Sequence, residues 1–592
     1  MRAERLSFLA ASALVFGYIL LRAFTVPIVH DEAMAFFSFA ERGSFIPFHA
    51  NWDAGNHVLS TALGWAGYRV FGFHVWALRL PSVLGFLLYA AYAWKWGLML
   101  RTPLVRRCLW AALLLMPFLL DFFSLFRGYG LAITFWSMAL YELCALLERP
   151  RTKHLVLALF AMACATWCSL NLLALWLAVL AITAVLVPVR KQPFGRSVWR
   201  ALIWLLLGVV PFLFAAAFAR ALGEHGALYY GNTLGVIKGS LASLTQLLLG
   251  TDGLFAPLLV LAVAVGCTGI AAWEFIRERT VPGAWAMAVL AALLWADCLG
   301  RVVLHHWDGT LYPEDRTALH WVPLFVLLFA FAADRLSRLN ARWQWAALVL
   351  LVLPARAITT SNLRTTMYWP EQAIPSSIFQ AAEREQQGAD RLLTIGAYHQ
   401  MPACWGFGLR ERGLALNAVD NTAFPHGGED LLLIDPQSMD IPPGYRMVQL
   451  GESGRVELLR KTTEPSLELV LDSTFSNEAN DGEYMELWHP AVEALRGHAF
   501  LVQLDMDLHA DPAPFSGTLI VEVDSAGEKL HYEYILGQFF GRAANSDSIH
   551  TVRRIPTVSQ GADRAVVYLF NPDRQGLSSK GRLRVHLIRD GA

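Results

Sequence analysis

The chain has 592 residues, of which 55% are hydrophobic and only 16% are charged, and its mean hydropathy is +0.41. A water-soluble domain of this composition would aggregate, so the composition excludes a fully soluble protein and indicates an integral membrane protein. Basic and acidic residues both number 48, so the formal net charge is zero and no nucleic acid partner is expected.

Apolar runs long enough to cross a bilayer core of about 30 Å predict about eleven transmembrane helices within residues 1–360. The first run follows Arg2 and Arg5 and is longer than the apolar part of a usual signal peptide, so we expect an uncleaved span rather than a signal peptide. The expected spans are residues 6–26, 76–100, 108–124, 129–147, 154–168, 171–189, 201–219, 254–276, 284–304, 318–334 and 343–359.

Every second connection between these runs is basic, and basic connections face the cytoplasm. An odd number of spans then places the N-terminus in the cytoplasm and the chain after residue 360 outside it. The basic residues after the first span are Arg101, Arg106, Arg107, Arg149, Arg151, Lys153, Arg190, Lys191, Arg196, Arg200, Arg277, Arg279, Arg335, Arg338 and Arg342.

Two adjacent carboxylates, Asp31 and Glu32, follow the first span directly after His30. Each would cost about 2.5–3.5 kcal/mol at a bilayer centre, so the pair is expected in an external loop or in a wet cavity. A carboxylate there is suited to act as a general base. The alternative is structural, because acids also stabilise the first turn of a helix, here one over residues 33–41.

The first external loop, residues 27–75, is too long for a simple connection and is expected to be structured. Residues 55–72 place apolar side chains on one face of a helix, which is typical of an amphipathic helix in the membrane interface. Such a helix can position a lipid-linked substrate. Asn56 and His57 open it, and Asp53 before it is either a further acid or the N-cap.

Two arginines mark later external positions. Arg127 and Tyr129 open the fourth expected span, and Arg316 lies in the loop before a late span. A guanidinium in such a place either binds phosphate in a bidentate manner or anchors a helix end at the interface. His305, His306 and Asp308 have the side chains of metal ligands, but a solvated loop is the commoner explanation, and no metal site is predicted there.

The chain after residue 360 has the composition of a soluble region, and we expect two domains in it. Residues 361–463 predict a small α/β layer with strands at 391–395 and 431–434. Residues 464–592 alternate apolar and polar side chains, as in Phe500 to Leu508, which predicts a β-sandwich or jelly roll. This last domain is either a structural cap or a carbohydrate-binding module; candidate aromatic residues are Trp488, Tyr532 and Tyr534.

The order of these motifs resembles the C-superfamily (GT-C) glycosyltransferases. Within it, the chain is similar to the group of protein O-mannosyltransferases, lipid A aminoarabinose transferases and lipopolysaccharide galacturonosyltransferases. His57 is followed by Val58, whereas the family often has proline there. The segments that carry the resemblance are Asp31-Glu32, Asn56-His57, Ala77-Leu78-Arg79-Leu80-Pro81-Ser82, Arg127-Gly128-Tyr129 and Tyr312 to Pro323.

The resemblance implies a GT-C transmembrane domain that moves a hexose or pentose from a polyprenyl phosphate carrier to a glycan, lipid or protein acceptor. Asp31 would be the general base, and Glu32 beside it would raise its basicity. Because the leaving lipid phosphate is already a stable anion, cations suffice to stabilise it, and a single displacement with inversion follows. His57, Arg127, Tyr129 and Arg316 would bind the donor phosphate or lipid, and His30, Asp53 and Asn56 would contact substrate.

No cofactor is predicted with certainty, and the residues leave open whether a divalent cation takes part. The bacterial inner membrane is the expected location, because Cys404 is the one cysteine of the exported region, which therefore holds no internal disulfide, and because the resembled group is largely bacterial.

Two other kinds of function are considered. A transporter or flippase of a lipid-linked glycan predicts ionisable residues near the bilayer midplane, and Asp121 and Asp297 are the candidates. A glycan-binding protein anchored by its membrane part is the third hypothesis, for which about eleven spans are more than an anchor needs.

Overall fold

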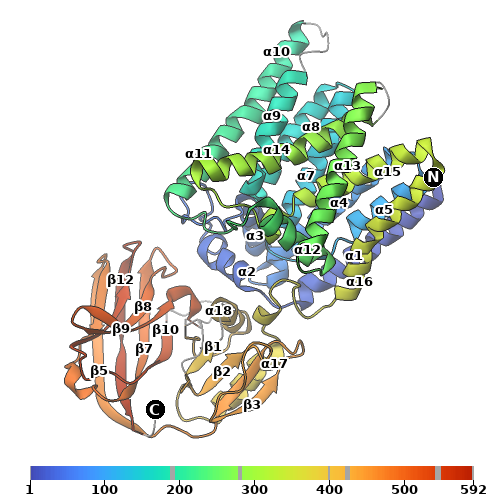
Figure 1. The fold of residues 1–592 in the computed structure, drawn as a ribbon. Helices are drawn as coiled ribbons and strands as arrows, with labels where there is room; N and C mark the ends of the chain where they lie inside the picture. The colour runs from blue at the N-terminus through green and yellow to red at the C-terminus, as the bar shows by residue number, and fades with distance from the viewer. Residues whose placement is uncertain are drawn as a thin grey trace. The chain divides into compact units, whose positions relative to one another are not determined.

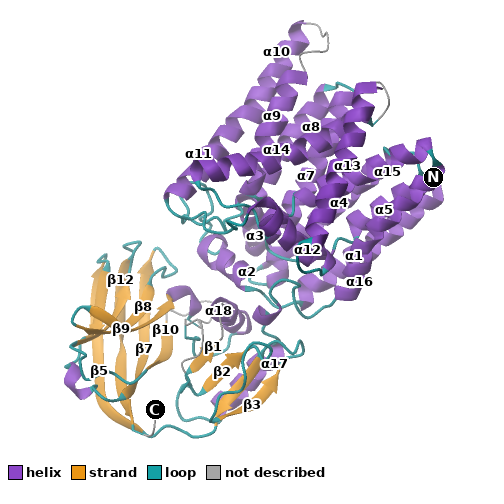
Figure 2. Ribbon diagram, in the orientation of Figure 1, coloured by secondary structure: helices purple, strands orange, loops and turns teal. Residues whose placement is uncertain are grey.

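The structure is a computed structural model that describes residues 2–186, 194–277, 283–397, 401–420, 427–540 and 548–589. The chain forms two compact units: Met1–Thr25 with Ser38–Leu363, and Val26–Phe37 with Arg364–Ala592. We call the first the membrane unit and the second the C-terminal unit. Figure 2 shows that strands are confined to the C-terminal unit in the described parts of the chain. Arg190, Lys191 and Arg279 of the basic connections lie outside the described residues.

The membrane unit is built of helices (Figure 1). Their bounds are α1 Arg2–Thr25, α3 Val58–Phe71, α4 Val75–Leu98, α5 Pro103–Leu114, α6 Pro117–Phe123, α7 Gly128–Glu148, α8 Thr152–Cys168, α9 Leu173–Leu186, α10 Phe194–Ile203, α11 Val210–Glu224, α12 Ala242–Leu249, α13 Phe255–Arg277, α14 Ala284–Asp308, α15 Trp321–Leu339 and α16 Val352–Thr360.

The prediction of a multi-pass helical membrane protein followed by a β-sheet region is confirmed, but the count of eleven spans is not. Within the described residues, seven helices are long and apolar enough to cross a membrane, or eight if the bent pair α5 and α6 forms one span. The difference arises because two expected spans fold as shorter apolar helices, Thr152–Cys168 and Leu170–Val185, and residues 318–334 lie in the more polar α15. Apolar runs in sequence therefore overstate the number of full-length spans here.

Helix α7 is the most buried candidate span of the membrane unit. Several buried charged side chains of this unit form ion pairs, which offset the cost of burying charge. Arg22 of α1 and Asp121 of α6 are both buried and lie 2.5 Å apart. His154 of α8 lies 2.5 Å from Glu142 of α7, which also accepts a hydrogen bond from Tyr92 at 2.8 Å. The first pair joins helices about 100 residues apart, and the second joins the consecutive helices α7 and α8.

The C-terminal unit begins with an α/β layer. A four-stranded sheet has the order β1-β2-β4-β3, in which β1 and β2 are parallel and the other pairs antiparallel. The bounds are β1 Ile395–Ala397, β2 Leu431–Ile434, β3 Tyr445–Leu450, β4 Glu457–Lys461, with helices α17 Ser376–Gln387 and α18 Met401–Arg412. The second predicted strand is correct, but the first was placed at 391–395 and begins at Ile395.

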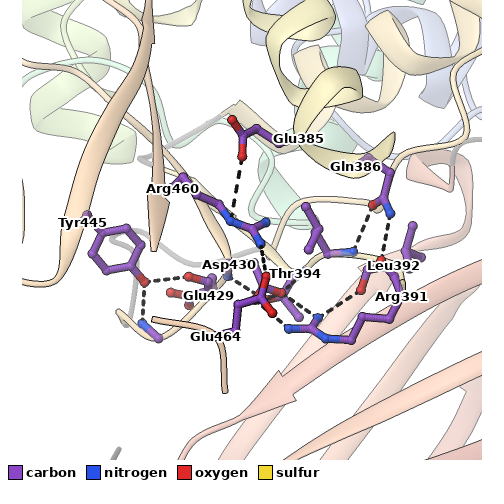
Figure 3. Close-up of polar contacts among 12 residues, drawn as sticks. Glu385, Gln386, Arg391, Leu392, Thr394, Glu429, Asp430, Tyr445, Arg460 and Glu464 are labelled. Atoms are coloured by element: carbon purple, nitrogen blue, oxygen red, sulfur yellow. Dashed lines mark hydrogen bonds and ion pairs between the residues drawn. The ribbon is translucent and has the colours of Figure 1, made fainter. Parts of the chain in front are cut away.

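Polar contacts explain the displaced strand (Figure 3). The two terminal nitrogens of Arg391 donate hydrogen bonds to the two carboxylate oxygens of Asp430, each at 2.7 Å. Asp430 also accepts a hydrogen bond from the backbone N–H of Thr394 at 2.8 Å. The side-chain amide oxygen of Gln386 accepts from the N–H of Leu393 at 3.0 Å. The backbone N–H groups of Leu393 and Thr394 are therefore used by side chains instead of by a neighbouring strand.

Two four-stranded antiparallel sheets complete the C-terminal unit, in the orders β10-β7-β12-β5 and β6-β11-β8-β9. The side chains that the alternation assigned to the core, such as Val502 and Leu504, are buried. Ser579 of one sheet donates to the sulfur of Met485 in the other at 3.4 Å, so the two sheets pack face to face. The bounds are β5 Leu467–Asn480, β6 Tyr484–Trp488, β7 Ala499–Asp511, β8 Thr518–Ser525, β9 Glu528–Leu536, β10 Ser548–Ile555, β11 Arg564–Phe570 and β12 Gly576–Ile588.

Candidate active site

The acid pair lies in the first turn of a short helix, α2 His30–Ala35, which belongs to the C-terminal unit. Glu32 is fully buried, and its carboxylate accepts a hydrogen bond from the backbone N–H of Val29 at 3.3 Å. Asp31 is partly exposed. The two acids therefore differ: Glu32 stabilises the start of the helix, as the structural alternative expects, and Asp31 is the one that solvent reaches.

Helix α18 and two further segments of the C-terminal unit hold α2 and the two residues that follow it. The ring of Phe407 in α18 makes edge contacts with Phe36 at 5.4 Å and with Phe37 at 6.1 Å. Phe37 also contacts Phe539 at 5.5 Å. The backbone N–H of His30 donates to the side-chain oxygen of Gln372 at 3.0 Å. We call residues 26–37 with these contacts the acid segment.

Cys404 of α18 is buried beside the acid segment. Burial raises the pKa of its thiol well above the usual value, and the negative charges of Glu32 and Asp31 raise it further. Neither Phe407, Gln372 nor Cys404 was singled out from the sequence, because no periodicity or motif connects them to residues 26–37. The ring contacts and the charges of the acid pair connect them only in the folded chain.

A second group of predicted residues is brought together in the membrane unit. His57 is the N-cap of α3, and Arg127 is the N-cap of α7. The ring of Tyr129 meets the ring of His57 edge-on at 4.8 Å. Arg127 donates to the backbone oxygen of Gly55 at 3.5 Å and is 5% exposed. We call His57, Arg127 and Tyr129 the anion group.

Glycine makes the convergence of α3 and α7 possible. A side chain at Gly128 would place its Cβ 2.0 Å from the backbone oxygen of Cys168 and 2.7 Å from Cγ of His57. A side chain at Gly64 of α3 would lie 2.1 Å from the ring of Phe126. The sequence Arg127-Gly128-Tyr129 therefore needs its glycine because α7 begins against α8 and the start of α3.

Two helix N-termini and a buried guanidinium thus face one small region. Helix N-termini carry partial positive charge and attract anions. The interaction of one N-terminus with an anion contributes about 0.3–1 kcal/mol, and up to about 2 kcal/mol where solvent is partly excluded. Arginine adds a full charge and can bind phosphate through two hydrogen bonds. The anion group has the chemistry of a phosphate site.

The other predicted residues of the first loop have structural contacts. Asp53 accepts a hydrogen bond from the N–H of Gly55 at 2.7 Å, which shapes the turn before α3. Asn56 is buried and donates to the backbone oxygen of Phe45 at 3.1 Å. Helix α3 buries small polar residues, such as Ser60 and Thr61, and leaves its apolar residues exposed, including Leu63, Val70 and Phe71. This exposed apolar face is suited to lipid contact.

Arg316 lies in a separate polar group of the membrane unit. Its guanidinium stacks over the ring of Tyr230 at 4.1 Å and donates to the Tyr230 hydroxyl at 3.1 Å, and that hydroxyl donates to Asp315 at 3.1 Å. The backbones of Asn232 and Tyr312 join the two loops by paired hydrogen bonds of 2.9 and 3.0 Å. Tyr230 was missed in the sequence because nothing links the loop of residue 230 to that of residue 316.

His305 and His306, which were expected in a solvated loop, lie in the last turn of α14, where both contact backbone. Nδ1 of His305 lies 2.9 Å from the backbone oxygen of Thr310, and Nδ1 of His306 lies 2.9 Å from that of Val302. Within the described ranges, no group of three or more histidine, cysteine, aspartate or glutamate side chains is arranged to hold a metal ion.

The chain is similar to solved structures, but no match was found by sequence. No protein-family model matches the chain, and no curated protein matches it. Among solved structures, ArnT from Cupriavidus metallidurans bound to undecaprenyl phosphate has 14% identity and a TM-score of 0.44, over 77% of this chain and 98% of that one.

Two mycobacterial structures are also similar. Arabinosyltransferase EmbB from Mycobacterium smegmatis has 12% identity and a TM-score of 0.35, over 98% of this chain and 64% of that one. Arabinofuranosyltransferase AftD from Mycobacteria has 13% identity and a TM-score of 0.38, over 99% and 62%. These structures come from the kind of enzyme to which the sequence was likened.

Proposed function

We propose that this chain is a membrane glycosyltransferase that moves a sugar from a polyprenyl-phosphate-linked donor to an acceptor hydroxyl, with inversion, on the extracytoplasmic side. The observation that carries the proposal is the anion group, where a buried arginine joins two helix N-termini. A lipid phosphate is the anion that a membrane protein meets at such a place, and the exposed apolar face of α3 suits its lipid.

In this proposal Arg127 and His57 stabilise the negative charge that grows on the phosphate oxygens as the glycosidic bond breaks. Tyr129 fixes the His57 ring by its edge contact. Arg316, with Tyr230 beneath it, supplies a further cation for the donor. No acid is needed for the leaving group, because the polyprenyl phosphate that leaves is a phosphate monoester, which is a stable anion at neutral pH.

The acceptor hydroxyl is a weak nucleophile and needs a base. Asp31 takes this role, since its side chain is partly exposed, whereas the carboxylate of Glu32 is used in holding the helix start. Glu32 then acts by holding the start of the helix. Its negative charge also disfavours the ionised form of Asp31, so Asp31 accepts a proton more readily. One base and one displacement give an inverted product.

The test uses the purified full-length protein with a panel of polyprenyl-phosphate-linked hexoses and pentoses and with glycan, lipid and peptide acceptors. We expect transfer from at least one donor, with the anomeric configuration inverted by NMR, and no measurable transfer by Asp31→Asn. Asp390→Asn, which changes an exposed acid of the same unit, is the matched control and should be active. Retention of configuration, or full activity of Asp31→Asn, would contradict the proposal.

One observation favours the second candidate, a lipid-glycan transporter. Asp297 of α14 is buried, lies 2.8 Å from His320 and 3.4 Å from Arg301, and accepts from the Trp321 indole at 2.5 Å. Paired ionisable groups in a membrane-spanning helix are expected of transporters. A flipping assay in proteoliposomes separates the two functions: a transporter moves the lipid-linked glycan in the Asp31→Asn variant, and a transferase does not.

A further inference from the structure

Helix α2, which carries Asp31 and Glu32, begins without a polar side chain at its N-cap. The N-cap residue is Val29, whose side chain cannot accept a hydrogen bond. Serine, threonine, aspartate and asparagine are preferred at this position, because they accept from the free N–H groups of the first turn. The backbone oxygen of Val29 accepts from the N–H groups of Glu32 and Ala33, both at 3.0 Å. The N–H of His30, the first residue of the helix, needs an acceptor from elsewhere in the chain.

Gln372 supplies this acceptor from 342 positions away. Its side-chain oxygen accepts from the N–H of His30 at 3.0 Å. Gln372 is 2% exposed, so the bond is shielded from solvent. A buried N–H without an acceptor destabilises the fold, so this bond is one of the interactions that fix where α2 begins. It therefore also bears on the direction of Asp31, the next residue.

The short turn that carries Gln372 is fixed to the sheet of the α/β layer. This turn is η7 Pro370–Gln372, and its Glu371 side chain lies 3.8 Å from the guanidinium of Arg455. Arg455 also donates two hydrogen bonds to Asp435, at 3.1 and 2.7 Å. Asp435 follows β2 directly and is fully buried. Contacts within the C-terminal unit thus lead from the sheet to the start of α2.

The acceptor at position 372 is an uncharged amide, and this matters for the base. Asp31 already has Glu32 as a negative neighbour. A carboxylate at position 372 could accept the same hydrogen bond, but it would add a further negative charge beside the first turn of α2. Such a charge disfavours the ionised form of Asp31, which would then be less available as a base at neutral pH. An amide holds the helix without adding this charge.

We propose that Gln372 is a positioning residue for the transfer reaction: it caps α2 in place of a local side chain and directs Asp31 without adding charge. The inference rests on the proposed function, because it takes Asp31 as the base. Gln372 acts through the backbone of His30 and not on the reacting atoms. One role of the chain after residue 364 is then to hold the base.

The first measurement needs no transfer activity. Hydrogen exchange of the full-length protein, read by mass spectrometry on peptides that cover residues 26–37, reports the opening of α2. Gln372→Met keeps the length of the side chain and removes the acceptor, so these amides should exchange about threefold or more faster. Gln386→Met is the matched control and should leave their exchange unchanged. Gln386 also accepts a backbone N–H at 3.0 Å, but from Leu393, before strand β1.

The second measurement is the transfer kinetics of the same variants. In Gln372→Met, kcat should fall about tenfold or more while KM for the donor stays within about twofold, since a displacement of about 1 Å can cost about 100-fold in rate. Gln386→Met should keep both values.

Gln372→Glu retains the acceptor and adds a charge, so it should keep much of the maximal rate. The rate rises with pH as Asp31 loses its proton, and in this variant the midpoint of that rise should move up by about one pH unit. A purely structural role of Gln372 would not move the midpoint. This variant also decides the question if Gln372→Met does not fold.

Unchanged exchange or unchanged kcat in Gln372→Met would overturn the proposal. Equal losses in Gln386→Met, or an unmoved pH midpoint in Gln372→Glu, would overturn it as well. If the unchanged protein transfers no sugar, the proposed function fails, and hydrogen exchange still decides whether Gln372 caps α2. The failure of the cap and the failure of the transferase are therefore distinguishable.

Discussion

The acid segment and the anion group are built in different ways. Asp31 and Glu32 lie on a six-residue helix held by aromatic contacts to the C-terminal unit, whereas His57 and Arg127 cap long helices of the membrane unit. The anion group depends on a glycine that permits close packing, and the acid segment depends on side chains more than 300 residues away in the chain. In the proposed function, the base is thus carried by a short helix of the C-terminal unit, and the phosphate site by packed helices of the membrane unit.

Lipid binding should depend most on the close packing at Gly128. Gly128→Ala places a methyl group against the Cys168 carbonyl and the His57 ring, and overpacking of this kind costs about 1–3 kcal/mol or more. We expect binding of undecaprenyl phosphate, measured by native mass spectrometry, to weaken about tenfold or more, since about 1.4 kcal/mol is a factor of ten.

The matched control for this glycine is Gly266 of α13, where an added Cβ meets nothing within 4 Å. Gly266→Ala should bind the lipid as the unchanged protein does. Normal lipid binding by Gly128→Ala would show that the two helix starts tolerate separation and that the anion group is not a tightly packed site.

The transfer rate should depend on the aromatic contacts that hold the acid segment. Phe407→Ala removes the contacts with Phe36 and Phe37, so Asp31 is displaced, and a displacement of about 1 Å can cost about 100-fold in rate. We expect kcat to fall about 10- to 100-fold while lipid binding is kept. Phe407→Leu, which preserves most of the volume, should recover much of the rate; equal losses of rate and lipid binding would refute the separation of roles.

Arg316 should have a smaller effect. Its stacking on Tyr230 at a partly exposed position corresponds to about 0.5–2 kcal/mol, so Arg316→Gln should raise KM for the donor about two- to tenfold and leave kcat near its original value. Arg220→Gln removes an exposed arginine paired with Glu224 and serves as the control. A fall in kcat alone would place Arg316 in the chemistry of the transfer.

The smallest effect is a change in thiol reactivity. The charges of Glu32 and Asp31 raise the pKa of Cys404, so removing one charge by Asp31→Asn lowers that pKa and leaves more reactive thiolate at a given pH. We expect slow alkylation of Cys404, read by peptide mass spectrometry, to become faster in Asp31→Asn at pH 8. An unchanged rate would mean that Asp31 does not face this thiol.

Much of the fold was predictable because the signals were local. Apolar runs identified the membrane unit, and alternation along β7 and β12 identified buried strands. The lengths of the helices were predicted less well, because an apolar run does not reveal whether a helix spans the bilayer or ends early. Helices α8 and α9 are examples. The strand expected at 391–395 failed because Arg391 and Thr394 bind Asp430, which lies 39 and 36 positions further along the chain.

The candidate site was predictable in its residue types but not in its partners. Asp31, His57 and Arg127 stand out as polar residues beside apolar runs, which a sequence shows directly. Phe407, Gln372 and Tyr230 do not, because each looks like an ordinary residue of a helix or loop. Their roles come from packing between segments far apart in the chain, which no local pattern encodes.

The most direct test measures donor binding and transfer separately in Asp31→Asn and Arg127→Gln, with Arg69→Gln, an exposed arginine of α3, as the matched control. Loss of a general base should lower the transfer rate about 10²- to 10⁴-fold and leave binding of undecaprenyl phosphate intact. Loss of the phosphate-binding arginine should weaken that binding about tenfold or more. If Asp31→Asn loses lipid binding, or if Arg127→Gln binds the lipid normally, the assignment of base and phosphate site is wrong.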